Sequence, residues 1–122
     1  MITNLSDFHP TWADRFNARD VDGMLALGEG GAAFVPQPGN VISGTADVRA
    51  ALEWFLSLNA PIRIDVRHAI EAGDIGLVIA DWELAGTGPD GSPVELKGST
   101  ADVVRRGADG WKLVIDNPFG TA

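Results

Sequence analysis

The spacing of hydrophobic residues changes halfway along the chain. In the first half, Phe8, Trp12 and Phe16 recur every four residues, which is typical of one face of a helix. A short second helix is predicted after this stripe, and a third helix is predicted over residues 46–58, where apolar residues again share one face. Residues 32–35 form a predicted short strand between the second and third helices. The first half is therefore expected to be mainly helical.

In the second half, apolar and polar residues alternate, which indicates β-strands. One face of the first strand carries Ile62, Ile64, Val66, His68 and Ile70. Turn sequences then lead into strands over residues 75–87 and 94–106, and the last strand carries Trp111, Leu113 and Ile115. Three helices followed by an antiparallel meander predict one α+β domain over residues 1–122, with the helices packed on one face of a curved sheet.

Two polar residues fall on the apolar faces of these strands, Asp102 and His68. If the turns set the register, His68 lies opposite Val78, and Val78 lies opposite Asp102. The two polar side chains would then be about 10 Å apart on one face. The same reasoning places Asn117 beside Thr100. A shift of one residue would turn a side chain to the other face.

A buried carboxylate must be protonated, hydrogen-bonded or hydrated, because an unpaired charge is costly in the core. Asp102 is therefore either satisfied by Thr100, Asn117 or backbone groups, or it lines a pocket as an acid, a base or a hydrogen-bond donor. His68 is either a structural residue or its partner in such a pocket. The sequence leaves these alternatives open.

Composition narrows the chemistry further. Nine Lys and Arg against 17 Asp and Glu give a net charge of −8, which argues against nucleic acid or an anionic membrane as a partner. There is no cysteine and no tyrosine, so thiolate and phenol chemistry are excluded. His9 and His68 lack metal-ligand spacing, and no glycine cluster forms a phosphate loop, so neither a metal nor another cofactor is predicted. Because no targeting or membrane-spanning segment is evident, a cytoplasmic protein is expected.

Several short motifs occur in a characteristic order: Phe16-Asn17-Ala18-Arg19-Asp20-Val21-Asp22, Phe34-Val35-Pro36-Gln37-Pro38-Gly39, Ser43-Gly44-Thr45, Gly73-Asp74, Asp81-Trp82, Asp102-Val103-Val104-Arg105-Arg106 and Asp109-Gly110-Trp111-Lys112. With the order of elements, they resemble the nuclear-transport-factor-2-like superfamily, and within it the small bacterial SnoaL-like and ketosteroid-isomerase-like proteins. The resemblance covers nearly the whole chain. It implies a cone-shaped half-barrel in which three N-terminal helices close an apolar pocket over a strongly curved, mainly antiparallel sheet, usually in a homodimer packed through the sheet.

The catalytic residues of ketosteroid isomerases carry over only in part. Their general base is an aspartate before a proline, where this chain has Gln37-Pro38, and glutamine cannot accept a proton at neutral pH. Their phenol donor has no counterpart. Their second acid, a protonated aspartate that donates to a developing oxyanion, aligns with Asp102.

Two functions are compatible with these features. One is a cofactor-free acid/base isomerase or cyclase acting on a small apolar carbonyl-bearing molecule, with Asp102 as the acid or base and His68 as its partner. The other is a non-catalytic dimeric domain for small-molecule binding or assembly. In either case the expected pocket residues are Trp12, Phe16, Phe34, Gln37, Trp54, Trp82, Thr100 and Asn117.

Overall fold

The computed structural model describes residues 1–121 and contains a short 3₁₀ helix, three α-helices and six strands. In chain order these are η1 (Leu5–Asp7), α1 (Phe8–Asn17), α2 (Val21–Leu25), β1 (Gly28–Gln37), β2 (Asn40–Ser43), α3 (Thr45–Ser57), β3 (Ile62–Ala72), β4 (Ile75–Thr87), β5 (Pro93–Gly107) and β6 (Gly110–Asp116). No helix within residues 1–121 is long and apolar enough to cross a membrane.

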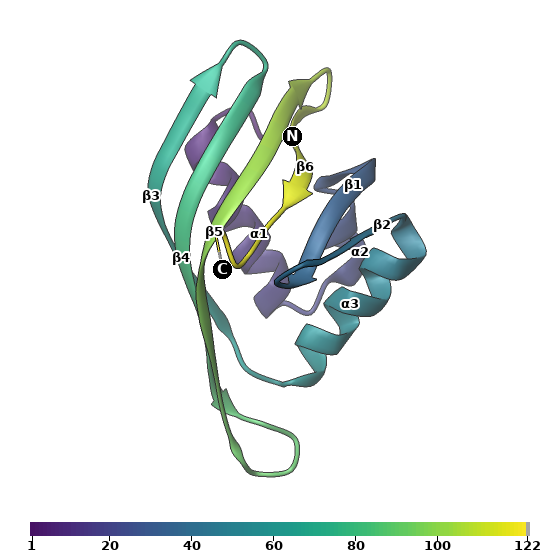
Figure 1. The fold of residues 1–122 in the computed structure, drawn as a ribbon, viewed down its shortest axis with the longest axis vertical. Coiled ribbons are helices and arrows are strands. Elements are labelled where there is room, and N and C mark those ends of the chain that lie inside the picture. Colours follow the sequence, from purple (N-terminus) through teal and green to yellow (C-terminus); the bar gives the residue numbers. More distant parts are fainter. Residues whose placement is uncertain (122) are drawn as a thin grey trace.

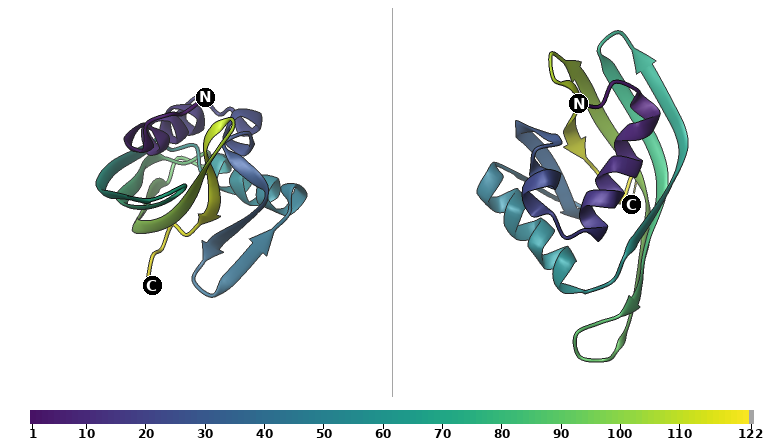
Figure 2. Two further views of the ribbon diagram at one scale, coloured as in Figure 1. Left: turned by 90° about the horizontal axis from the view of Figure 1, so that it is seen from above. Right: turned by 180° about the vertical axis from the view of Figure 1, so that it is seen from behind.

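The six strands form one curved sheet in the order β2-β1-β6-β5-β4-β3. All neighbouring pairs are antiparallel except β1 and β6, which run parallel. Helix α1 lies behind β3–β5 in Figure 1 and in front of them in the view from behind in Figure 2. Helix α3 packs beside β1 and β2. The predicted α+β class, with helices on one side of a curved and mainly antiparallel sheet, is confirmed.

The first two strands differ from the prediction. Strand β1 begins at Gly28 rather than at residue 32, and β2 was not predicted. Apolar spacing could not reveal these segments, because the added part of β1 is glycine-rich and exposed or half-buried. It is held instead by main-chain pairing with β6, where the Leu113 N–H donates to the Leu27 carbonyl at 2.8 Å.

A β-bulge in β3 reverses the predicted orientation of His68. The pairing with β4 is regular up to Val66, which lies opposite Ala80, and then shifts so that His68 lies opposite Ile79 rather than Val78. The extra residue turns the rest of the strand over. His68 is therefore exposed, and Ile70 is 56% exposed on the outer face of the sheet. The prediction that both residues face the core is wrong.

A second bulge changes the end of β6. Val104 lies opposite Leu113, whereas the preceding residue, Val103, lies opposite Ile115. This shift brings Ile115 to the outer face, where it is 39% exposed, against the predicted inward orientation. The next residue, Asp116, consequently turns toward the interior. Each bulge thus changes which polar side chain reaches the core.

Candidate functional site

Asp102 lies on the inner face of β5 and is only 4% exposed. It lies opposite Val78, as the turns predicted. Its Oδ1 accepts hydrogen bonds from the Thr100 hydroxyl at 2.5 Å and from the Asn117 N–H at 2.7 Å. Asp102 is therefore a buried carboxylate that is fixed by neighbouring donors.

The other oxygen of Asp102 is bound by His9, which sequence reasoning did not select. His9 Nε2 lies 2.6 Å from Asp102 Oδ2, and the histidine is 4% exposed. His9 Nδ1 has no hydrogen-bond partner within residues 1–121. Of the two neutral tautomers, only the one protonated at Nε2 can donate to Asp102. The partner of Asp102 is thus a helix residue, and not the predicted strand residue His68.

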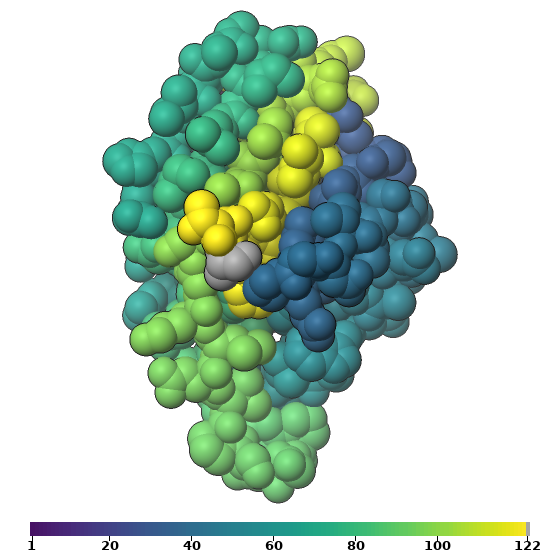
Figure 3. Space-filling view, viewed as in Figure 1, coloured from purple at the N-terminus to yellow at the C-terminus, as the bar shows by residue number. Residues whose placement is uncertain are grey.

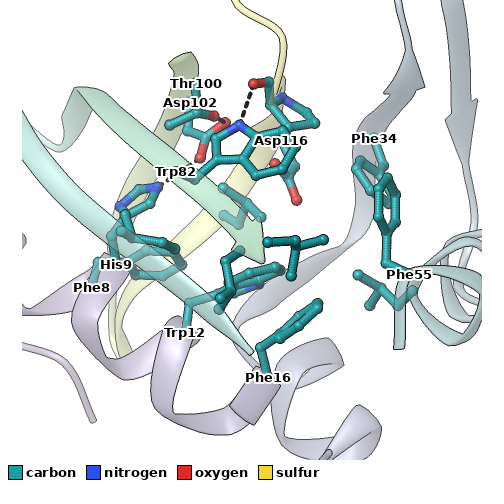
Figure 4. Close-up of a pocket in the computed structure, with 16 residues that line it drawn as sticks. Phe8, His9, Trp12, Phe16, Phe34, Phe55, Trp82, Thr100, Asp102 and Asp116 are labelled. Carbon is teal, nitrogen blue, oxygen red and sulfur yellow. Dashed lines mark hydrogen bonds and ion pairs between the residues drawn. The ribbon is translucent and has the colours of Figure 1, made fainter. Parts of the chain in front are cut away.

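An apolar cavity of about 50 Å³ adjoins this pair. This volume leaves room for roughly three to five water molecules. Side chains from α1, α3 and the sheet form its wall, and Figure 4 shows the aromatic ones facing a common space below Asp102. The lining residues are Phe8, His9, Trp12, Phe16, Phe34, Leu52, Phe55, Ile62, Ile64, Trp82, Leu84, Thr100, Asp102, Leu113, Asp116 and Pro118.

The C-terminal segment covers one side of this cavity. The Trp82 indole N–H donates to the Pro118 carbonyl at 2.6 Å, and Phe119 packs edge-on against Trp82 at 5.7 Å. The Asn117 side chain donates to the Gly120 carbonyl at 2.9 Å and so holds the segment in a turn. Figure 3 shows these C-terminal residues (yellow) lying over the middle of the molecule, next to the blue β1–β2 region.

Asp116 brings a second carboxyl to the cavity (Figure 4). Burial raises the pKa of Asp116 well above its ordinary range, and the adjacent Asp102 carboxyl raises it further, because two neighbouring carboxylates repel each other. Within residues 1–121, the only hydrogen-bonding neighbour of the Asp116 carboxyl is the Asp102 carboxyl. Asp116 therefore holds its proton to a higher pH than an ordinary aspartate does.

This raised pKa predicts how stability depends on pH. Between the ordinary pKa of an unfolded aspartate, about 3.9, and the raised pKa of folded Asp116, only the folded protein holds the proton. Unfolding then releases a proton, so stability is expected to fall as pH rises, by at most about 1.4 kcal/mol per pH unit from this group. Replacing Asp116 with asparagine should remove this component. Urea denaturation of both proteins across this range tests it, and parallel stability curves would contradict it.

Five of the eight predicted pocket residues line the cavity, namely Trp12, Phe16, Phe34, Trp82 and Thr100. The other three do not. Gln37 is exposed at the end of β1, and Trp54 is 54% exposed on α3. Asn117 lies beside Thr100 as predicted, but it serves the site through its backbone.

His9 and Asp116 were missed for different reasons. His9 does carry a sequence signal, because it shares a helical stripe with the buried residues Ala13 and Phe16. Asp116 carries none, since strict alternation with Leu113 and Ile115 points it outward until the bulge is known. Within the described residues 1–121, no group of three His, Asp or Glu is arranged to hold a metal ion.

The model of the SnoaL-like domain family matches residues 11–114. A comparison with curated proteins gave no match. One similar solved structure is a candidate calcium/calmodulin-dependent protein kinase type II association domain from Thiobacillus denitrificans. It has 21% identity and a TM-score of 0.79, and the match covers 100% of this chain and 98% of the other.

Two further solved structures are similar. A candidate dehydratase of the NTF2-like family from Streptomyces avermitilis has 21% identity and a TM-score of 0.76, with 91% of this chain and 89% of the other covered. An NTF2-like protein of unknown function from Shewanella oneidensis has 13% identity and a TM-score of 0.74, with 91% and 92% covered. At these identities the likeness shows the shared fold alone.

Proposed function

The chain belongs to the SnoaL-like domain family, and we propose that it takes up a small apolar carbonyl compound and acts on it by cofactor-free acid/base chemistry, as an isomerase or cyclase. The observation that carries this proposal is the buried pair of Asp102 and His9 at one end of a cavity whose remaining wall is almost entirely apolar. Such a cavity can hold an apolar molecule, and the few polar groups at one end can fix the orientation of its carbonyl group.

Asp102 is the proposed base. Its Oδ2 accepts one hydrogen bond from His9 and keeps a second lone pair for a substrate proton. In the proposed step Asp102 takes a proton from the carbon next to the carbonyl, and the electron pair of the broken C–H bond moves onto the carbonyl oxygen as an enolate. Where the substrate carries a C=C bond one carbon further along, the enolate is conjugated with it, and return of the proton to the far end of that bond moves the double bond and gives an isomer. His9, which replaces His68 in this role, holds the carboxylate in place.

Uptake of a ligand can be followed through the four tryptophans. Trp12 and Trp82 line the cavity, whereas Trp54 and Trp111 do not. Addition of acetophenone, a small apolar ketone, is expected to shift the indole N–H NMR signals of Trp12 and Trp82 and to leave those of Trp54 and Trp111 in place. Absence of any shift at Trp12 and Trp82 would overturn the proposed pocket function.

Catalysis can be separated from binding with the same ketone. A base that removes protons next to the carbonyl should accelerate exchange of the acetophenone methyl protons for deuterium in deuterium oxide, seen as loss of the methyl proton signal. The proposed enzyme predicts acceleration by the wild-type protein. Binding without acceleration would favour the alternative, a non-catalytic small-molecule-binding or assembly domain.

The alternative function rests on the outer face of the sheet, on the side away from α1. Ile70, Leu77 and Ile115 are 56%, 38% and 39% exposed there, and both bulges contribute by turning Ile70 and Ile115 outward. The similar Thiobacillus denitrificans structure is described as an association domain. We propose that this face joins two copies of the chain in a homodimer.

Replacing Leu77 with aspartate is expected to convert the dimer to a monomer, because it places a charge in the centre of an apolar contact. Val41→Asp is the matched control, since Val41 is 65% exposed on β2 and lies outside this face. Light scattering coupled to gel filtration gives the mass of each protein. A dimer that survives Leu77→Asp, or a monomeric wild type, would contradict the proposed interface.

A further inference from the structure

Asp116 stands in the wall between two cavities. The first is the cavity beside Asp102, and the second, of about 80 Å³, lies between α2, α3 and β1. The cavities share Trp12, Phe34, Leu52, Leu113 and Asp116 among their lining residues. A ligand in either cavity therefore lies against Asp116.

The hydrogen bonds around the two carboxyls differ. Asp102 is surrounded by donors from three residues, His9, Thr100 and Asn117. Asp116 has only the Asp102 carboxyl as a hydrogen-bonding neighbour within residues 1–121. When two carboxyls lie side by side, one of them retains a proton. Asp116 has fewer donors to stabilise a negative charge than Asp102 has, so protonation of Asp116 gives up fewer hydrogen bonds. Because the Asp102 carboxyl already accepts from these three donors, the Asp116 proton can turn from Asp102 to the carbonyl oxygen of a ligand.

The charges around the cavities restrict the ligand. No Lys or Arg lines either cavity within the described chain. The titratable groups facing Asp116 are Asp102 from β5 and His9 from α1, and the second cavity adds Glu29 from β1. Glu29 is paired with Arg105, with Oε2 and Nε 3.1 Å apart. A carboxylate or phosphate ligand would find no compensating cation here, whereas a neutral oxygen acceptor would find a donor.

We propose that Asp116 donates a hydrogen bond to the ligand's carbonyl oxygen, and that the ligand is a neutral ketone with one apolar group in each cavity. This proposal rests on the function proposed above. Asp102 and Asp116 then have complementary tasks. Asp102 takes the proton next to the carbonyl, and Asp116 stabilises the negative charge that develops on the oxygen. Two neighbouring carboxyls in unlike environments are a known route to an acid and a base at one pH.

Three probes of similar size test the ligand class: acetophenone, cumene and benzoate. Cumene carries a methyl group in place of the ketone oxygen, and benzoate carries a negative charge. The wild-type protein is expected to bind acetophenone roughly threefold to tenfold more tightly than cumene, the worth of one hydrogen bond, and not to bind benzoate at neutral pH. Affinities follow from the Trp12 and Trp82 indole shifts.

Two substitutions assign this preference to Asp116. Asp116→Leu is expected to abolish the preference for acetophenone and to keep cumene binding, because the cavity stays apolar. Asp116→Asn keeps an N–H donor, so it should retain the preference but lose its pH dependence; in the wild type the preference falls as the acid ionises at higher pH. Retention of the preference in Asp116→Leu, with its loss in Asp102→Leu, would assign the donor to Asp102 and overturn the proposal.

The second cavity has its own test. Val48 lines only this cavity, so Val48→Phe should reduce its volume without touching the carboxyls. Butyrophenone, which adds two carbons to the methyl side of acetophenone, is expected to bind Val48→Phe more weakly than wild type, while acetophenone binds both alike. Equal binding of butyrophenone to both proteins would overturn the placement of the ligand across the wall.

A measurement without ligand checks where the proton lies. NMR of aspartate labelled at the side-chain carboxyl carbon should show one residue, absent from Asp116→Asn, that titrates well above the exposed aspartates. An Asp116 that titrates with the exposed residues would overturn the donor assignment. Equal binding of acetophenone and cumene would also overturn it and leave the pocket function standing, whereas failure of both to bind would overturn the two together.

Discussion

Replacing Asp102 with asparagine is expected to lower the rate of proton exchange on acetophenone by about 10²- to 10⁴-fold, the usual contribution of a positioned general base. Asparagine has nearly the same shape, but its amide cannot accept a proton at neutral pH. Its oxygen can still accept from the Thr100 hydroxyl and the Asn117 N–H, which both bind Asp102 Oδ1. The site should therefore keep its shape and its ligand while losing the base.

The matched control is Asp65→Asn. Asp65 is an exposed aspartate on β3, at 3.7 Å from the Arg63 guanidinium and outside both cavities. It should leave both acetophenone binding and proton exchange unchanged. The indole shifts of Trp12 and Trp82 report whether each variant still binds the ketone. If Asp102→Asn binds acetophenone normally and exchanges protons as fast as wild type, Asp102 is not the base.

The fold and half of the site were accessible from the sequence because both follow from regular periodicity. The helical stripe of Trp12 and Phe16, and the alternation that points Trp82, Thr100 and Asp102 inward, persist without interruption in the structure. Turn sequences also set the β4–β5 register correctly, with Val78 opposite Asp102. Where the backbone is regular, the side chain's direction can be counted from its neighbours.

The remaining predictions failed where the backbone departs from that regularity. A bulge adds one residue to a strand and inverts every side chain beyond it. One bulge turns His68 outward and the other turns Asp116 inward. Alternation of polarity does break at both positions, at Arg67-His68 in β3 and over residues 113–115 in β6, but such a break does not by itself say which way the side chains beyond it point. Trp54 failed differently: on α3 it lies between the buried residues Leu52 and Phe55 in sequence but off their face.

Replacing His9 with alanine is expected to reduce the free energy of unfolding by about 3 kcal/mol, because it removes the donor that His9 Nε2 supplies to Oδ2 of the buried Asp102 carboxylate. His68→Ala is the matched control, since that histidine is exposed on the outer face; it should change stability by less than about 0.5 kcal/mol. Urea denaturation at neutral pH measures both.

The loss in His9→Ala has a specific cause that a double-mutant cycle can isolate. In an Asp102→Leu background His9 no longer has its carboxylate partner, so the same His9→Ala substitution should cost only the packing of the imidazole against Phe8, whose ring centroid lies 5.3 Å away. A smaller loss in that background assigns the difference to the contact between His9 Nε2 and Asp102 Oδ2. Equal losses in the two backgrounds would mean that His9 stabilises α1 by packing alone and does not hold the carboxylate for chemistry.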